Sequence, residues 1–245
     1  MRHKQIENTG ELDIMSKIYI TGDTHCDITK IYNISKKYKL TEADYLIVCG
    51  DFGYIWNGSW TKNINKIERV CPATILFIDG NHENFNIIES LPIEEKFGAP
   101  VHRCGPHTFH LMRGRIYTIN GHNFFTFGGA KSTDKHLRTP EKTWWYQEEP
   151  TLEEISFGEK TLYDNIDKIE YVLTHECPSV VKRIIYHGLD TFTYSLPAVF
   201  DRWIESLYFD APNFKTWFFG HLHIDETINM FKSRALFDDV VVIED

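Results

Sequence analysis

Short apolar runs rich in Ile, Val, Phe and Tyr recur along the chain, and many of them end in Gly, Asp, Asn or His. Such runs predict buried strands that are each followed by a loop. The clearest predicted strands are 18–21, 45–49, 74–78, 171–174 and 216–219. Stretches with helical spacing lie between several of them, namely 28–38, 63–70 and 152–168. This alternation predicts an α/β sheet covered by helices.

The pattern changes in the middle of the chain. Two alternating segments, 115–119 and 122–127, flank Asn120-Gly121, a pair that favours a tight turn between antiparallel strands. A second alternation, at 229–231, 234–237 and 240–243, predicts closing antiparallel strands. The segment 131–150 is polar and irregular, and long loops of this kind are usually functional or mobile. We therefore expect mixed rather than purely parallel sheets.

The length of the chain limits the number of domains. At about 150 residues per domain, 245 residues suffice for one large domain or two small ones. We find neither an internal repeat nor a low-complexity linker, so we expect a single domain over residues 15–245. Met15 stands just before the first predicted strand and is a possible alternative start, which would make residues 1–14 a flexible N-terminal extension.

Charge and cysteine content narrow the functional classes. The chain has 26 Lys and Arg against 35 Asp and Glu, a net charge of −9, which argues against broad binding to nucleic acid or anionic lipid. The apolar runs are far shorter than the roughly 20 residues that cross a bilayer. Five cysteines without a CxxC pair, and a first segment without a signal-peptide core, favour a reduced cytoplasmic protein. The oligomeric state is not indicated.

Polar residues of one kind follow five of the predicted strands. They are Asp23-Thr24-His25, Gly50-Asp51, Gly80-Asn81-His82-Glu83, Thr174-His175 and Gly220-His221-Leu222-His223. Each group taken singly is typical of a capped loop. Together they indicate a site, because α/β sheets bind ligands at the carboxyl ends of their strands.

The composition of this set indicates metal binding. Imidazole, carboxylate and amide ligands without thiolate suit Mn²⁺, Fe or Zn²⁺ better than Mg²⁺ or Ca²⁺. The candidate ligands are Asp23, His25, Asp51, Asn81, His175, His221 and His223. Seven ligands are too many for one ion, whereas a bridging Asp would give each of two ions four protein ligands. Two such ions activate a shared water and hold phosphoryl oxygens, which predicts phosphoester hydrolysis.

The ordered set resembles the calcineurin-like metallophosphoesterase superfamily, whose pattern D-x-H, G-D, G-N-H-[DE], H and G-H-x-H is matched from Asp23 to His223. The resemblance implies a two-sheet β-sandwich flanked by helices in four layers. It further implies one metal on Asp23, His25, Asp51 and His223, and a second on Asp51, Asn81, His175 and His221, with Asp51 as the bridge. His82 would contact the phosphate and assist the leaving oxygen. Mn²⁺ is the expected ion, with Fe, Zn²⁺ and Ni²⁺ as alternatives.

Departures from the patterns of particular subfamilies narrow the range of expected substrates. The second motif continues as Phe52-Gly53-Tyr54 and lacks the Arg of the protein Ser/Thr phosphatases, and the chain lacks the extra DNA-binding domains of the nuclease branch. The remaining resemblance is to small bacterial, archaeal or phage-type phosphoesterases. We expect a phosphodiesterase acting on a small or nucleotide-type substrate. The alternatives are a phosphomonoesterase, a nuclease on nucleic-acid ends, and a metal-binding scaffold without turnover.

Several residues near the motifs have two interpretations. Arg138 and Lys131 would bind the substrate phosphate or would be solvated loop charges. Trp144 and Trp145 would stack on a base or pack under the loop. Three acidic residues close to the ligands in sequence would orient imidazoles or cap loops. These are Asp79, Glu83 and Asp225.

Overall fold

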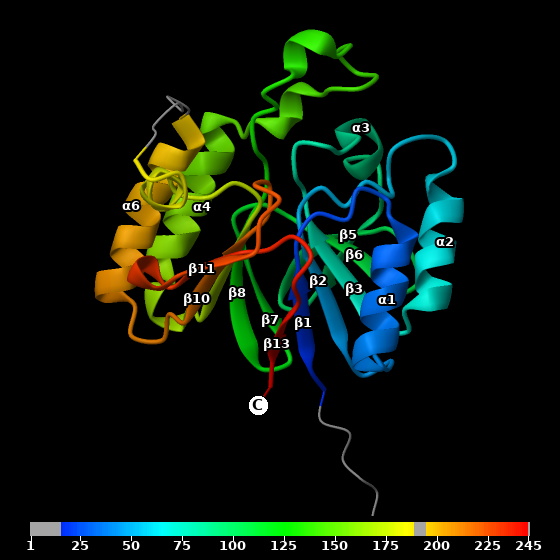
Figure 1. Ribbon diagram of the computed structural model, residues 1–245, viewed down its shortest axis with the longest axis horizontal. Helices are drawn as coiled ribbons and strands as arrows, with labels where there is room; N and C mark the ends of the chain where they lie inside the picture. Colours follow the sequence, from blue (N-terminus) through cyan, green and yellow to red (C-terminus); the bar gives the residue numbers. More distant parts are fainter. Residues whose placement is uncertain (1–15, 189–194, 245) are drawn as a thin grey trace, which may run out of the picture.

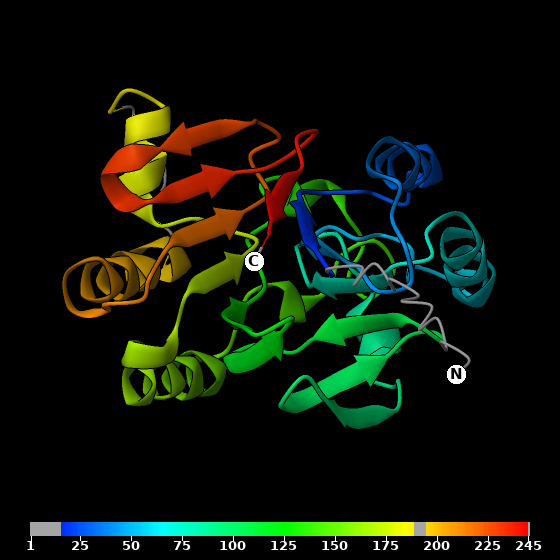
Figure 2. The same ribbon diagram turned by 90° about the horizontal axis from the view of Figure 1, so that it is seen from below.

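Two β-sheets pack face to face, and helices cover the outer face of each (Figures 1 and 2). The computed structural model describes residues 16–188 and 195–244. The expected extension, residues 1–14, lies outside this part of the chain, and the single domain over 15–245 stays a prediction. The four-layer arrangement confirms the expected fold class.

The first sheet has seven strands, which are β1 (Ile18–Thr21), β2 (Tyr45–Cys49), β3 (Thr74–Ile78), β4 (Ile93–Lys96), β5 (Ala99–Arg103), β6 (Thr108–Leu111) and β13 (Val241–Ile243). The second has six, which are β7 (Arg115–Ile119), β8 (His122–Phe127), β9 (Tyr171–Thr174), β10 (Thr216–Phe219), β11 (Glu226–Ile228) and β12 (Ser233–Ala235). The spatial orders are β13-β1-β2-β3-β6-β5-β4 and β11-β12-β10-β9-β8-β7. The centre of each sheet is parallel, and antiparallel strands lie toward the edges.

The helices are α1 (Ile28–Tyr38), α2 (Trp60–Val70), α3 (Phe85–Ile88), α4 (Leu152–Asp164), α5 (Ser179–Ile185) and α6 (Ser195–Asp210). Short 3-10 turns are η1 (Lys135–Leu137), η2 (Tyr146–Glu148), η3 (Ile166–Lys168) and η4 (Asn229–Phe231). Among the described residues, no helix has both the length and the apolar character needed to cross a membrane.

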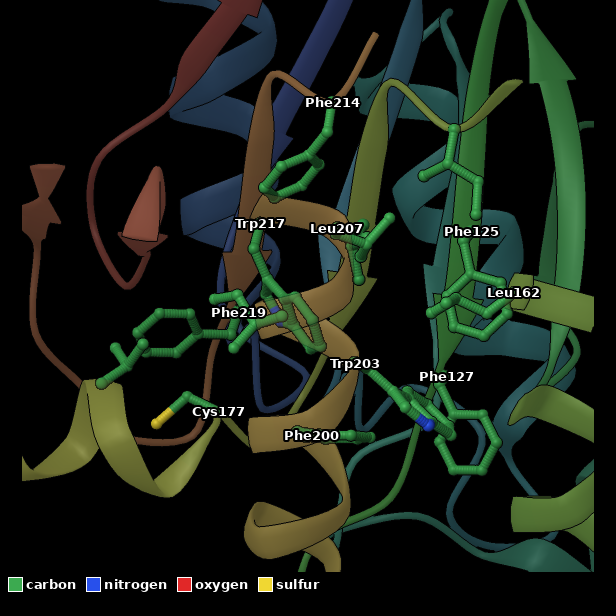
Figure 3. Close-up of a cluster of buried hydrophobic side chains, with 14 of the residues drawn as sticks. Phe125, Phe127, Leu162, Cys177, Phe200, Trp203, Leu207, Phe214, Trp217 and Phe219 are labelled. Atoms are coloured by element: carbon green, nitrogen blue, oxygen red, sulfur yellow. The ribbon is translucent and has the colours of Figure 1, made fainter. Parts of the chain in front are cut away.

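Three hydrophobic cores hold the layers together. One lies between the sheets and includes Ile20, Ile47 and Leu173. A second packs α1 and α2 against the outer face of the first sheet. In the third, Trp203 of α6 packs edge-on against Phe125 and Phe127 of β8 (Figure 3). These cores bury strands on both faces, which explains why the strands are continuous apolar runs.

The predicted strands at 18–21, 45–49, 74–78, 171–174 and 216–219 and the hairpin at 115–127 have the expected bounds. Helix α2 begins at Trp60, three residues earlier than predicted, and α4 ends at Asp164 before the separate turn η3.

The C-terminal prediction is wrong in part. Residues 229–231 form the turn η4, which ends at Lys232 in the left-handed conformation, so the chain turns back here instead of extending. Residues Ser233–Ala235 form β12, which pairs antiparallel with β11 but parallel with β10. Three-residue alternations are too short to fix either the element or its direction.

Candidate metal centre

The carboxyl ends of five strands meet at one end of the two sheets, below the segment 131–150 that rises above the fold in Figure 1. Strands β1, β2 and β3 deliver Asp23, Asp51 and Asn81, while β9 and β10 deliver residues 175 and 221–223 from the other sheet. The loops are bonded to one another, since the backbone N–H groups of Thr24 and His25 donate to the carbonyl oxygen of Asp51 at 3.1 and 2.8 Å. The site therefore spans both sheets.

Asp23 and Asp51 are the buried acids of the site, each about 1% exposed. The backbone N–H of His221 donates to Oδ1 of Asp23 at 3.0 Å, and that of His82 donates to Oδ1 of Asp51 at 2.8 Å. Among the described residues, Oδ2 of Asp23 is buried without a hydrogen bond of good geometry, although Nε2 of His223 lies 3.0 Å away. Each carboxylate is thus held by a neighbouring loop while its other oxygen faces the imidazoles.

Four of the predicted ligands form one cluster. Asp23, His25, Asp51 and His223 each offer a ligand atom, and these atoms all lie within 4.8 Å of one another. Nε2 of His25 lies 3.1 Å from Nε2 of His223, 3.7 Å from Asp23 Oδ2 and 3.8 Å from Asp51 Oδ2. Two imidazole nitrogens at this distance either share one proton or face a common cation. The donor set fits a divalent ion with mixed nitrogen and oxygen ligands.

The remaining predicted ligands lie on the other side of Asp51. Nε2 of His175 is 3.3 Å from Oδ1 of Asp51 and 3.1 Å from Oδ1 of Asn81. The opposite nitrogen of His175, Nδ1, donates to the carbonyl oxygen of Cys49 at 2.8 Å, so Nε2 is the atom left for the site. The ring of His221 lies 5.0 Å from that of His175. His175 and Asn81 thus offer nitrogen and oxygen donors beside Asp51 that suit a second divalent ion, whereas Nε2 of His221 lies 3.8 Å from Oε2 of Glu176.

Buried negative charge dominates the electrostatics of the centre. Burial lowers the pKa of His175, but the carboxylates of Asp51 and Asp23 outweigh it and raise that pKa to about 10. Burial raises the pKa of Asp51, yet His175, with which it also hydrogen-bonds, holds it well below its usual range. The centre thus attracts positive charge, which either protons or metal ions supply.

Backbone strain is concentrated in the same loops. His25, Asp51, His221 and His223 have φ values of 45°, 48°, 65° and 52°, in the left-handed region that side chains other than glycine rarely adopt. Each such residue costs on the order of 1–3 kcal/mol and persists where its surroundings fix it, often at functional sites. Four of the seven predicted ligands are strained in this way.

Two glycines allow the loops to approach this closely. A Cβ atom on Gly80 would lie 2.1 Å from Oδ1 of Asp51, and one on Gly220 would lie 2.3 Å from Oδ1 of Asp23. Only glycine leaves room for the carboxylates at these positions. The Gly residues of the G-N-H-E and G-H-x-H motifs therefore serve close packing.

His82 and Arg138 lie beside the cluster. The ring of His82 is 5.6 Å from that of His25, and Nη2 of Arg138 is 3.5 Å from Nε2 of His82. Burial lowers the pKa of His82, the nearby Asp51 opposes that shift, and Arg138 adds to it. Arg138 also donates two hydrogen bonds of 2.8 Å to Asp134. The structure thus brings together His82 and one of the two predicted cations, while Lys131 is half-buried at the start of the same loop.

The loop 131–150 is more closely integrated than its composition indicates. Trp144 and Trp145 are buried, and Trp145 packs edge-on against Trp56. Ser132 and Glu148 are also buried and hydrogen-bond to each other, and Oγ of Ser132 accepts from Nδ2 of Asn81. This pair could not be predicted from the sequence, because the two residues stand sixteen apart in an irregular segment and match no periodic pattern.

Of the two interpretations of Asp79, Glu83 and Asp225, their hydrogen bonds favour support of loops and other side chains over orientation of the ligand imidazoles. Asp79 binds Arg113 and His110, Glu83 accepts the backbone N–H groups of residues 52 and 53, and Asp225 accepts those of residues 237–239. The nearness of these three residues to the ligands in sequence therefore does not place their carboxylates against the ligand rings.

Comparison with known proteins identifies relatives over most of the chain. It is 24% identical over 242 residues to the lariat debranching enzyme of Saccharomyces cerevisiae, covering 85% of this chain and 57% of that one. It is 26% identical over 146 residues to the lariat debranching enzyme of Drosophila pseudoobscura pseudoobscura, covering 50% of this chain and 25% of that one. The chain therefore spans little more than half of the length of the first relative and a quarter of the second.

A solved structure with the same fold is that of TT1561 from Thermus thermophilus. It superposes with a TM-score of 0.52 at 11% identity, and the alignment covers 94% of this chain and 99% of that one. The sequence model of the calcineurin-like phosphoesterases matches residues 16–225, which include every predicted ligand from Asp23 to His223. This chain belongs to the calcineurin-like phosphoesterase family.

Proposed function

We propose that this protein is a metal-dependent phosphodiesterase that hydrolyses a small or nucleotide-type phosphodiester. The convergence of Asp23, His25, Asp51 and His223 at one point carries the proposal. These four residues would hold one ion. Asp51, Asn81, His175 and His221 would hold a second ion, with Asp51 shared. Mn²⁺ suits these ligands, and Fe, Zn²⁺ and Ni²⁺ are alternatives.

The two ions, when bound, supply an activated water and neutralise charge on the phosphoryl oxygens. The remaining chemistry belongs to the chain. His82 would deliver a proton to the leaving oxygen. Arg138, whose guanidinium lies 3.5 Å from that nitrogen, binds a phosphoryl oxygen and orients the ester, and Lys131 is the second candidate for this role.

The similarity to lariat debranching enzymes supports a diester over a monoester. The net charge of −9 disfavours long polyanions and supports a small substrate. The five free cysteine thiols support a reducing compartment, the cytoplasm. Monoesterase activity, action on nucleic-acid ends, and a scaffold without turnover are alternative outcomes of the test.

The test compares hydrolysis of bis-p-nitrophenyl phosphate and p-nitrophenyl phosphate by metal-stripped protein reloaded with Mn²⁺. We expect the diester to be preferred, and Asp51→Asn to lower its hydrolysis by at least about 100-fold. Asp44→Asn is the matched control, because Asp44 is also buried but accepts backbone N–H groups from Lys17 and Thr41. Unchanged activity in Asp51→Asn, or two bound ions without hydrolysis of either ester, would contradict the proposal.

A further inference from the structure

A chain of three buried side chains connects the predicted ligand Asn81 to the loop 131–150. The side-chain amide of Asn81 donates from Nδ2 to Oγ of Ser132 at 3.1 Å, and that hydroxyl donates to Oε2 of Glu148 at 2.6 Å. Asn81, Ser132 and Glu148 are 6%, 2% and 0% exposed. Water therefore has little access to these groups, and each depends on its protein partner.

The two hydrogen bonds that the Glu148 carboxylate accepts determine which group donates and which accepts along these three side chains. The backbone N–H of Ser132 donates to Oε1 of Glu148 at 2.9 Å, and the Ser132 hydroxyl donates to Oε2. A carboxylate only accepts hydrogen bonds, so the single hydroxyl hydrogen of Ser132 is committed to Glu148. Oγ of Ser132 must then accept, which requires the nitrogen of the Asn81 amide and not its oxygen.

The same arrangement decides what Asn81 presents to the metal centre. With Nδ2 held by Ser132, Oδ1 points to the other side, where it lies 3.1 Å from Nε2 of His175. An amide oxygen can bind a cation, whereas an amide NH₂ group cannot. Without Ser132, Nδ2 of Asn81 would lose this partner, and the amide would be held less firmly in the orientation that presents Oδ1.

We propose that Ser132 and Glu148 are positioning residues, which hold the amide oxygen of Asn81 toward the second metal ion. The inference rests on the proposed function, because it assumes that Asn81 is a ligand. It assigns a specific task to the loop 131–150, which also carries Arg138. Glu148 is anchored in turn, since its carbonyl oxygen accepts the backbone N–H of Ala130 at 3.1 Å.

The experiment titrates metal-stripped protein with Mn²⁺ in an isothermal calorimeter. Ser132→Ala removes the link. Glu148→Gln keeps the shape of the side chain but places an NH₂ group against Oγ of Ser132, which turns the hydroxyl hydrogen toward Asn81. We expect both variants to weaken one of the two Mn²⁺ sites by about 10- to 100-fold, the range seen when a partner of a metal ligand is removed. The other site should keep its affinity.

Two matched controls separate this effect from a loss of packing. Glu68→Gln alters a carboxylate that likewise accepts a backbone N–H, from His107, and a hydroxyl, from Thr108. Ser233→Ala removes a fully buried serine hydroxyl that donates to the carbonyl oxygen of Phe231. We expect both controls to bind two Mn²⁺ ions with the affinities of the unaltered protein.

The outcomes distinguish the two proposals. If the unaltered protein binds two ions and hydrolyses the diester, but Ser132→Ala and Glu148→Gln bind Mn²⁺ as it does, the positioning role is overturned and the proposed function stands. If the unaltered protein does not bind two ions, both are overturned. A variant that keeps the melting temperature of the unaltered metal-free protein and shows a single weakened site supports the positioning role, because a packing defect would lower that temperature.

Discussion

Replacing Gly220 by alanine tests whether the close approach of the two sheets builds the candidate metal centre. A Cβ atom at this position would lie 2.3 Å from Oδ1 of Asp23, 2.5 Å from the carbonyl oxygen of Cys49 and 3.2 Å from Nδ1 of His175. Real Cβ contacts are essentially never shorter than 3.0 Å, so the Asp23 carboxylate must retreat by the difference of 0.7 Å. The φ of Gly220 is not in the left-handed region, so the effect is steric.

The displacement of the Asp23 carboxylate determines the expected loss of hydrolytic activity. A functional site tolerates displacements of roughly 0.5 Å, and a misplacement of about 1 Å can cost on the order of 100-fold in rate. We therefore expect phosphodiester hydrolysis to fall by about 10- to 100-fold in Gly220→Ala. Overpacking of this kind costs about 1–3 kcal/mol, which for a chain of this size lowers the melting temperature by about 2–12 °C.

Activity with Mn²⁺ and calorimetric melting of the metal-free protein measure the two effects separately. Gly58→Ala is the control, because among the described residues no atom beyond its two chain neighbours lies within 4 Å of a Cβ at Gly58, and its φ is not in the left-handed region. The reasoning would be refuted if Gly220→Ala hydrolysed the diester and bound Mn²⁺ like the Gly58→Ala control.

Three further predictions concern stability. Mn²⁺ at 100 times its Kd should stabilise the metal-stripped protein by about 2.7 kcal/mol per site, and a melting temperature that does not respond to Mn²⁺ would contradict metal binding. Asp79→Ala leaves the buried guanidinium of Arg113 without its 2.6 Å partner and should cost about 3–5 kcal/mol in urea unfolding, so a cost below about 1 kcal/mol would argue against this pair. Burial and the neighbouring His110 lower the pKa of His102 to about 4. Between pH 6.5, the ordinary pKa of histidine, and about pH 4, His102 binds a proton in the unfolded chain but not in the folded protein. The free energy of unfolding should therefore fall as the pH decreases through this range, by about 1.4 kcal/mol per pH unit. His102→Gln should flatten that slope, whereas the same change at the exposed His136 should not.

The central strands could be predicted because burial on both faces requires apolar residues at nearly every position of the strand itself. Residues 45–49 and 74–78 are covered on both faces, by the helices α1 and α2 and by the second sheet, so nearly every position is apolar. The peripheral strands β4 and β5 could not be predicted from the sequence. β4 reads Ile-Glu-Glu-Lys and β5 contains Pro100 and Arg103, because these strands lie toward the edge of the sheet and are partly exposed. β5 pairs with β6 and β4 pairs with β5, and this pairing, which stabilises both strands, is not visible in a single segment.

Helix α6 was also missed, although its sequence carries a helical pattern. It buries Leu196, Phe200, Trp203, Ile204 and Leu207 against the second sheet. Their positions follow i, i+4, i+7, i+8 and i+11, which is the apolar stripe of an amphipathic helix, so this helix could have been predicted from the sequence.

The candidate centre shows the same limit on a smaller scale. Its predicted ligands occupy strand ends and could be found from short motifs, but the groups that support them come from other loops and act largely on the backbone. Glu83 holds the N–H groups of residues 52 and 53, directly after Asp51. Asp225 holds the backbone at 237–239, and the ring of Phe237 in that segment stacks on His223 at 4.5 Å. These contacts fix strained loops rather than individual rings, so their loss should move several ligands together. In this they differ from the proposed role of Ser132 and Glu148, whose loss should affect the orientation of Asn81 alone.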